Sequence, residues 1–367
     1  MRKTIIKVSL VFLSALLIAL LFISQTNLLV YQFKPIEPAL YYQAKQIQEA
    51  SPKDTLLVMT WNVKFGGARI DFWFDCYGDR VHMTEEEVIT NCAALAKKIE
   101  AVNPDILFLQ EADIDSWRTP GADMVQYLLD NTALNYGTYA SQWQVNYIPT
   151  KNLGKVNSGN AILSKWPLKE ATRIALPLLT EQDPVTRFFY LRRNLLITKL
   201  DIPNSSKPIY LIDTHTSAYS KENTRLVQLK ILQQVADSLV KAGNNVVFGG
   251  DFNTLPPGTK KLSKFDDSVC KDKDFLEDDY TKERDWLLPI YKSYSECIPL
   301  EQYNLNEEKY YSHTVNGHGF WNRRLDYLFS NLSWVPNSGM VHQDEKTGGM
   351  STMPLSDHAP LTGLLIK

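Results

Sequence analysis

The sequence predicts a layered α/β sandwich with mixed β-sheets, preceded by an N-terminal transmembrane helix. Three observations lead to this prediction. From residue 55 onward, apolar runs of strand length alternate with stretches of helical periodicity. Some strand candidates follow one another across a short turn, which favours antiparallel pairs beside the helix-linked ones. At the N-terminus, an uncharged apolar run follows three basic residues.

The predicted membrane anchor comprises residues 1–30. Arg2, Lys3 and Lys7 precede an uncharged run from position 8 to position 23, and apolar residues continue to position 30. Together they approach the roughly 20 apolar residues that a bilayer span needs. No small-x-small cleavage site follows, so we expect an uncleaved signal anchor rather than a removed signal peptide. Because the basic residues stay on the cytoplasmic side, the rest of the chain is expected outside the cytoplasm.

The remaining chain divides into a short and a long part. Residues 31–53 contain three prolines and are expected to form a stalk, and residues 54–367 are expected to form the catalytic domain. The net charge of −2 gives no general attraction to nucleic acid or to anionic membranes. This charge argues against a dedicated DNA-binding protein but does not exclude an enzyme that contacts DNA locally.

Four cysteines lie at positions 76, 92, 270 and 297, without C-x-x-C spacing, which argues against a structural zinc site. Outside the cytoplasm, two disulfides become possible, and the pairs nearest in sequence are Cys76 with Cys92 and Cys270 with Cys297. The sequence does not determine the pairing, and buried free thiols are the alternative.

The first half of the domain begins with "TLLVMTWN", residues 55–62, a strand candidate. A helix is expected over residues 83–103, because Thr84 and Glu87 form a capping box ahead of an apolar stripe. The run "DILFLQE" at 105–111 predicts a buried strand. A helix near 121–131 and strands near 137–143 and 158–168 continue the pattern.

The second half begins with two strand candidates, 188–202 and 207–215, joined by the turn signal "PNSS". A long helix is expected over about 221–242. Further strands are expected at 245–253 and 323–331, and a loop followed by a strand at 356–366.

Polar side chains stand where these apolar runs end, so each is positioned by a rigid element. Such a collection of residues from distant parts of a chain is the usual construction of an active site. The set is Asn62, Glu111, His215, Asp251, Asn253, Asp326, Asp357 and His358.

The residue types in this set indicate phosphoester hydrolysis. Carboxylate and amide oxygens from Glu111, Asp357 and the asparagines suit Mg²⁺ or Mn²⁺ rather than zinc. His215 and His358 titrate near neutrality, and a histidine paired with a carboxylate can deprotonate a water. A divalent ion and the second histidine would stabilise charge on a phosphate and on its leaving oxygen.

Seven segments occur in order along residues 55–367: "WNVKFGG", "DILFLQEAD", "NSGNAILSKWPL", "DTHTSA", "GGDFNTLP", "RRLDYLF" and "LSDHAPL". Together they resemble the signature series of the endonuclease/exonuclease/phosphatase superfamily, which includes DNase I-like nucleases, sphingomyelinases and inositol-polyphosphate phosphatases. One segment alone is weak support, but seven in order are strong. The resemblance implies the four-layered, DNase I-like form of the sandwich.

The resemblance also implies metal and phosphate ligands. Glu111 resembles the principal Mg²⁺ ligand, and Asn62 is expected to contact the metal or the phosphate. Asp357 matches the residue next to the catalytic histidine, which often helps to bind a metal in this family. Arg193 resembles an arginine that contacts phosphate before a strand, although the sequence alone does not separate it from Arg192.

The remaining residues match the catalytic positions of the family. Asp251 and Asn253 match a pair that orients the attacking water and binds a phosphate oxygen. His358 resembles the general base, oriented by Asp326. His215 matches a second histidine that donates to the phosphate or the leaving group; in this it resembles the DNase I and sphingomyelinase branch and departs from abasic-site endonucleases.

The predicted function is that of a membrane-anchored, monomeric, Mg²⁺- or Mn²⁺-dependent phosphodiesterase acting on nucleic acid or on a phospholipid headgroup. A catalytically inactive binding module on the same fold is the alternative class, disfavoured because the full residue set is intact. A sphingomyelinase-type enzyme rather than a nuclease is the alternative within the first class. His313 and His318 could form a metal pair, but their H-x-x-x-x-H spacing on a Gly-containing loop is poor evidence of ligand geometry, so we expect loop histidines without a site.

Overall fold

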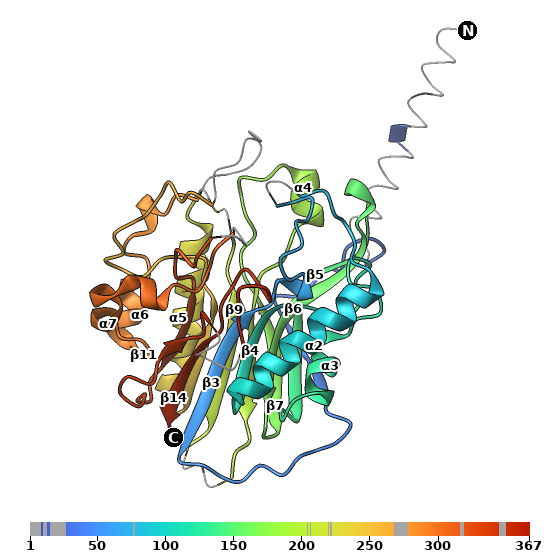
Figure 1. Cartoon of the computed structure of the whole chain (residues 1–367). Coiled ribbons are helices and arrows are strands. Elements are labelled where there is room, and N and C mark those ends of the chain that lie inside the picture. The colour runs from blue at the N-terminus through green and yellow to red at the C-terminus, as the bar shows by residue number, and fades with distance from the viewer. Residues whose placement is uncertain are drawn as a thin grey trace.

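The computed structural model contains two seven-stranded β-sheets packed face to face (Figure 1). The structure describes residues 9, 13–14, 27–75, 78–203, 205, 207–218, 220, 222–267, 278–315, 319–344 and 350–367. Both sheets are mixed, because each has one parallel pair among antiparallel pairs. The predicted α/β class with mixed sheets is therefore confirmed.

The first sheet has β3 and β4 as its parallel pair. Its strands, in spatial order, are β13 (Met340–Val341), β14 (Leu361–Ile366), β3 (Thr55–Asn62), β4 (Ile106–Asp113), β6 (Gly154–Ser164), β5 (Tyr136–Ile148) and β2 (Leu40–Gln43).

The second sheet has β9 and β10 as its parallel pair. Its strands, in spatial order, are β1 (Ile36–Pro38), β7 (Leu168–Ala175), β8 (Asn194–Leu200), β9 (Ile209–His215), β10 (Asn245–Asp251), β12 (Asp326–Ser330) and β11 (Ser295–Glu296).

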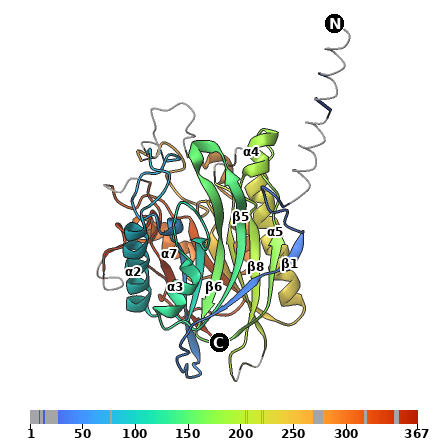
Figure 2. The same ribbon diagram turned by 90° about the vertical axis from the view of Figure 1, so that its right-hand side faces the viewer.

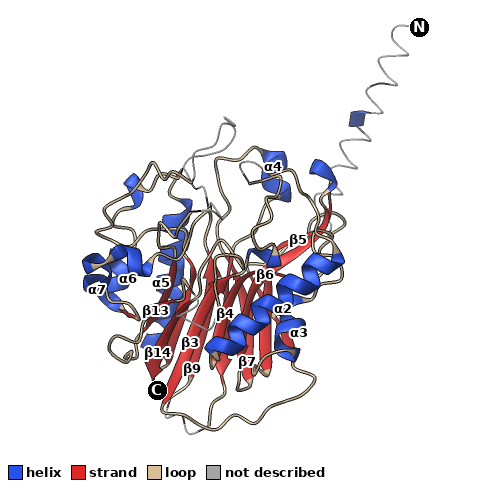
Figure 3. Cartoon of the chain, in the orientation of Figure 1, coloured by secondary structure: helices blue, strands red, loops and turns tan. Residues whose placement is uncertain are grey.

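Helices cover the outer face of each sheet, which gives four layers (Figures 2 and 3). The first sheet is covered by α2 (Glu85–Val102) and α3 (Met124–Asp130), and the second by α5 (Thr224–Lys241) and α6 (Leu288–Ser293). The other helical segments are α4 (Pro184–Phe189), α7 (Leu300–Leu305), η1 (Lys64–Gly66), η2 (Thr150–Asn152), η3 (Thr281–Glu283) and η4 (Glu307–Tyr310).

The central strands are buried on both faces. In β3, Leu56 and Val58 belong to the core between the sheets, whereas Met59 and Trp61 belong to the core under α2 and α3. Successive side chains of a strand point to opposite faces, so two covered faces require a continuous apolar run. This requirement explains why "TLLVMTWN" and "DILFLQE" lack the polar alternation of a half-exposed strand.

Several predicted elements have the expected place. The capping box at the start of α2 is present, because Thr84 accepts from the backbone N–H of Glu87 and the Glu87 carboxylate accepts from that of Thr84. The predicted strand at 188–202 is wrong in its first part. An α-helix, α4, occupies 184–189 instead, because Asp183 caps its N-terminus and Pro184 starts its first turn.

The segment predicted as a stalk contributes strands to both sheets. β1 pairs with β7 of the second sheet, and β2 pairs with β5 of the first. Residues 36–38 and 40–43 of this segment thus have backbone hydrogen-bond partners in the domain. The division at residue 54 as a whole stays a prediction.

The predicted anchor, residues 1–30, lies mostly outside the described residues. Within the part of the chain that the structure describes, no helix is both long and apolar enough to cross a bilayer. Cys92 and Cys297 are buried free thiols, which is the alternative to the suggested disulfides; Cys76 and Cys270 lie outside the described residues.

Candidate active site

Polar side chains from both sheets meet at the carboxyl ends of the central strands, which form one end of the sandwich. β3 runs parallel to β4, and β9 runs parallel to β10, so the carboxyl ends of each pair lie together. These ends carry Asn62, Glu111, His215 and Asp251. His215 lies directly opposite Asp251 in the register of β9 and β10.

Asp251 is the centre of the site. Its Oδ2 accepts a 3.0 Å hydrogen bond from Nδ2 of Asn62. The same oxygen lies 3.2 Å from Nε2 of His215 and 3.5 Å from Nε2 of His358. Its Oδ1 accepts from the backbone N–H of Asn253 at 2.9 Å. Burial raises the pKa of Asp251, so this carboxylate depends on its donors to stay ionised.

The two glycines before Asp251 are required by close backbone contacts. A Cβ at Gly249 would lie 2.1 Å from the carbonyl oxygen of Tyr327, and one at Gly250 would lie 1.9 Å from that of Thr214. Gly250 also has φ +123°, which disfavours other residues. The "GGD" sequence therefore lets β10 pass tightly between β9 and β12 and deliver Asp251 to the centre.

Glu111 lies at an irregular point of β4. The register between β4 and β6 shifts between Leu109 and Ala112, and Glu111 itself has φ +60°. Its Oε1 accepts from Nδ2 of Asn62 at 3.2 Å. Strained non-glycine residues often occur at functional sites, where the surrounding fold holds them. Burial raises the pKa of Glu111, and the charge of Asp357 raises this pKa further.

His358 is held by Asp326 at the start of β12. Nδ1 of His358 lies 2.8 Å from Oδ2 of Asp326, which also accepts from the hydroxyl of Ser312 at 2.6 Å. Burial alone would lower the pKa of His358, but the carboxylates of Asp326 and Asp251 raise this pKa well above its usual value. Nε2 is the ring nitrogen left to face the site.

His215 has the opposite electrostatics. Burial lowers its pKa well below the usual value, and the nearby Arg193 lowers this pKa further. Nε2 faces Asp251, whereas Nδ1 is buried without a hydrogen-bond partner, 3.7 Å from Oε1 of Glu111. At neutral pH His215 is therefore an uncharged imidazole.

Arg193 is buried beside the site. Its Nη1 donates to Oε1 of Gln142 at 2.9 Å, while its buried Nε has no partner. Burial lowers the pKa of both arginines, and only at Arg193 do the charges of Glu111 and Asp251 partly offset this effect. Arg193, not Arg192, therefore interacts with the acidic centre.

Asn253 and Asp357 complete the predicted set. Asn253 has φ +47°, and its Nδ2 donates to the backbone oxygen of Thr216 at 3.2 Å. Asp357 is half-buried; burial would raise its pKa, but the charges of Lys64 and His358 lower it below the usual value. The structure thus brings all the predicted site residues to one edge of the sandwich, and their individual roles stay predictions.

Two further residues lie close to the predicted set, although neither was expected at the site from the sequence. His313 was expected to lie on a loop without a site, yet its ring centroid is 4.4 Å from that of His358. Lys64 is buried, pairs with Asp75 at 3.0 Å and acts electrostatically on Asp357. The signal for Lys64 was available, because a lysine two residues after Asn62 places a cation next to the site. His318 lies outside the described residues.

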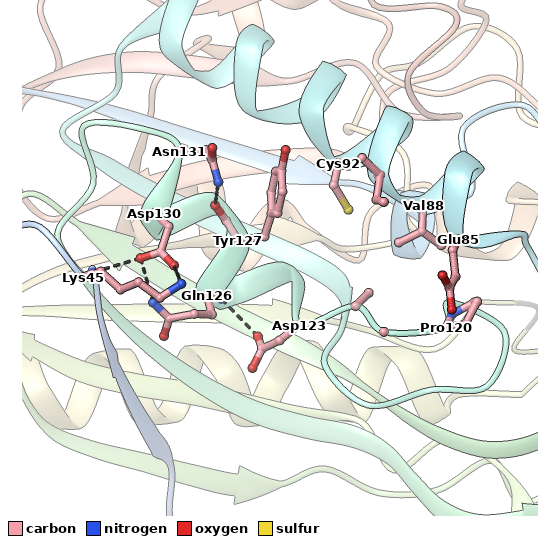
Figure 4. Close-up of a pocket in the computed structure, with 13 residues that line it drawn as sticks. Lys45, Glu85, Val88, Cys92, Pro120, Asp123, Gln126, Tyr127, Asp130 and Asn131 are labelled. Atoms are coloured by element: carbon pink, nitrogen blue, oxygen red, sulfur yellow. Dashed lines mark hydrogen bonds and ion pairs between the residues drawn. The ribbon is translucent and has the colours of Figure 1, made fainter.

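A separate groove of about 630 Å³ lies between α2 and α3 (Figure 4). Its walls include Lys45, Asp123, Cys92 and Asp130, and Lys45 pairs with Asp130 at 2.8 Å. It contains none of the residues of the acidic centre. We therefore assign the chemistry to the strand ends and not to this groove.

Comparison with known proteins identifies the family of this chain. The model of the Endonuclease/Exonuclease/phosphatase family matches residues 59–358, and the chain belongs to this family. Comparison with curated proteins gives no match.

Solved structures share the fold at low sequence identity. An endonuclease/exonuclease/phosphatase from Beutenbergia cavernae is 18% identical over 86% of this chain and 72% of its own, with a TM-score of 0.56. The human Nocturnin catalytic domain with bound sulfate is 17% identical over 89% and 97%, with a TM-score of 0.51. A humanized TDP2 from D. rerio is 16% identical over 86% and 100%, also with a TM-score of 0.51.

The donor set near Glu111 fits a divalent ion. Glu111 and Asp357 repel each other enough to raise the pKa of Glu111, a repulsion that a bound cation would relieve. Nδ1 of His215, which faces Glu111 at 3.7 Å, is buried without a hydrogen-bond partner. Carboxylate and amide oxygens are the ligands that Mg²⁺ and Mn²⁺ prefer.

Proposed function

We propose that this protein is a divalent-metal-dependent phosphodiesterase that cleaves its substrate by attack of a water. The observation that carries the proposal is the convergence of two histidines with opposite electrostatics on one oxygen of Asp251. Hydrolysis of a phosphodiester needs a group that takes a proton from water and another that stabilises the leaving oxygen. His358 and His215 are placed to supply these two functions.

His358 would act as the base. Nε2 accepts the proton of the water, Nδ1 stays bonded to Asp326, and the imidazolium that forms is stabilised by Asp326 and Asp251. The water oxygen forms a new bond to phosphorus, and the bond from phosphorus to the leaving oxygen breaks. Since the base must be unprotonated to act, the raised pKa of His358 limits activity at low pH.

The other side chains would hold the phosphate. Arg193, with an unpartnered buried Nε, is suited to a non-bridging oxygen, and Asn253 and Asp251 to the water and the phosphate. His215 would donate a hydrogen bond from Nε2 to the leaving oxygen, which takes up a proton from solvent as it departs, so that His215 stays neutral. Glu111, Asn62 and Asp357 would hold the divalent ion, which supplies Lewis acidity toward the phosphate.

A phospholipid headgroup is the second candidate for the substrate, beside nucleic acid. The observation that favours it is where the predicted anchor joins the domain. Asn146 on β5 donates to the backbone oxygens of Asn27 and Leu28, and Tyr31 donates to the backbone of Gln144. This part of β5 extends beyond the site end of the sheet (Figure 1). An anchor at this end would direct the active site toward a membrane on the outer side of the cell.

The proposal is tested with the full chain in detergent and a generic diester, bis-p-nitrophenyl phosphate. We expect turnover with Mg²⁺ or Mn²⁺ that EDTA abolishes. No turnover with either metal would favour the alternative, an inactive binding module. A panel of DNA, RNA and sphingomyelin vesicles then distinguishes the substrates, since activity on vesicles alone would support the lipid candidate.

A further inference from the structure

His313, Asp357 and His358 form a cluster of potential metal ligands that the proposed reaction does not use as a unit. One donor atom from each residue lies within 4.8 Å of the other two. His313 contributes a half-buried ring, tilted by 49° against the ring of His358. Nδ1 of His313 is buried and has no hydrogen-bond partner.

The backbone fixes this cluster before any ligand arrives. His313 lies between two segments and bridges to Arg323 on one side and to His358 on the other. The backbone N–H of Thr314 donates to the backbone oxygen of Asp357 at 3.1 Å. The backbone N–H of Ala359 donates to the backbone oxygen of Ser312 at 2.7 Å. A site held by paired backbone loses little conformational entropy when an ion binds.

The donor types differ from those around Glu111. Two imidazoles and one carboxylate form a set that zinc accepts, with a fourth position left open for water. Magnesium prefers oxygen ligands, so it would bind this cluster of two imidazoles and one carboxylate more weakly than zinc. A metal-bound histidine usually donates its other ring N–H to a carboxylate, and Nδ1 of His358 already faces Asp326 at 2.8 Å.

We propose that His313, Asp357 and His358 form an inhibitory binding site for zinc, which shares only Asp357 with the proposed site of the catalytic metal. Zinc would take the lone pair on Nε2 of His358, which is the atom that accepts the proton of the water. It would also occupy Asp357, which the catalytic metal shares. The inhibition rests on the proposed function, whereas the binding of zinc does not.

Zinc binding is measured on the full chain by competition with a chromophoric chelator in excess Mg²⁺. We expect one zinc per chain, and His313→Phe should weaken its affinity by at least about tenfold, because even outer partners of a metal site contribute 10- to 100-fold. Phe keeps the ring and removes both nitrogens. Asp357→Asn is a second variant with the same expectation, should His313→Phe not fold.

His82 offers a matched control. Its half-buried ring on another loop contacts the backbone oxygen of Leu153 at 3.1 Å, so His82→Phe makes the same change away from the cluster. Zinc affinity should not change in this variant. Unchanged affinity in both folded cluster variants, or an equal loss in His82→Phe, would overturn the assignment of the site.

Inhibition is measured with the generic diester, each variant relative to its own rate without zinc. His313→Phe should require about tenfold more zinc than the wild type for the same fractional inhibition. Zinc binding without inhibition of an active wild type would refute the inhibitory role. Absence of turnover in every condition would instead refute the proposed function, while the binding measurement still decides whether the site exists.

Discussion

Two sides of Asp251 hold a histidine each, and they differ in charge. On one side, His358 has the Asp326 carboxylate behind it and its pKa is raised. On the other, Nδ1 of His215 has no hydrogen-bond partner, since the Glu111 carboxylate stays 3.7 Å away, and burial together with the nearby Arg193 lowers the pKa of this ring. Both rings are buried, at 4% and 3% exposure, so burial does not explain the difference.

The contrast shows that the neighbour behind a ring decides its role. A carboxylate at Nδ1 stabilises the imidazolium, which makes the histidine a strong base once its proton is removed. Without this carboxylate, burial keeps the imidazole neutral, and it can donate a hydrogen bond without carrying charge. A substitution on one side of Asp251 therefore tests whether the histidine on the other side responds.

The largest effect is expected on the His358 side. His358→Gln should lower kcat by about 10³, and Asp326→Asn by about 10². Because Asp326 raises the pKa of His358, the acid limb of the pH–rate profile should move to lower pH in Asp326→Asn. Stopped assays of the generic diester from pH 5 to pH 10 measure both quantities.

A double variant sharpens this prediction. His358→Gln with Asp326→Asn should cost little more than His358→Gln alone, because the two residues act as one unit. Additive losses, or an acid limb that stays in place in Asp326→Asn, would mean that His358 is not the base. His215 or a hydroxide bound to the metal would then take that role.

On the His215 side, Glu111→Gln should lower the rate by about 10² at a Mg²⁺ concentration that saturates the wild type. Loss of the carboxylate lowers the affinity for the metal more than it lowers the stability of the fold, so added metal should recover part of the activity. The matched control is Glu86→Gln, a change on the exposed face of α2. An unaltered metal dependence in Glu111→Gln would exclude this residue as the main ligand.

His215→Gln should lower kcat by about tenfold and leave the acid limb unmoved. The pKa of His215 already lies far below neutrality, so its titration does not set the limb. A shift of the limb in this variant would break the comparison between the two sides, since it would assign the base to His215.

Sequence reasoning succeeded where a residue is positioned by a strand. Asn62, Asp251 and His215 each end an apolar run that forms a buried strand. Because such runs are recognisable in the sequence, the residues at their ends can be placed at the end of the sheet. It failed for His313, whose place depends on pairing with residues 45 positions away, next to His358. A loop without periodicity carries no signal of such pairing. The strands of the supposed stalk were missed for a similar reason, because their partners lie on β5 and β7.

The smallest effect concerns stability. Asp213 precedes His215 by two residues, and its Oδ1 accepts from Nε2 of Gln110 at 2.6 Å across the two sheets. Burial raises its pKa well above the usual value, and Oδ2 has no partner. It is thus a buried carboxyl that, unlike Asp326, lacks a basic partner.

Because the folded pKa of Asp213 is raised, its contribution to stability is present below the unfolded pKa of about 4 and is lost as pH rises. Asp213→Asn keeps the acceptor for Gln110 and cannot ionise. Its free energy of unfolding, compared with that of the wild type, should therefore be higher at pH 7 than at pH 4, because only the wild type loses stability as pH rises. Urea denaturation at the two pH values measures it; an equal difference at both would contradict the raised pKa.

The pairing of β1 and β2 has a consequence for any shortened form of the protein. A chain that begins at residue 54 would leave β7 and β5 with open rows of backbone donors and acceptors, which favour self-association between copies. A chain that begins at residue 27 keeps both rows covered. In light scattering, the shorter form should aggregate at concentrations at which the longer form stays dispersed, because each sheet would have lost the edge strand that covers β7 or β5.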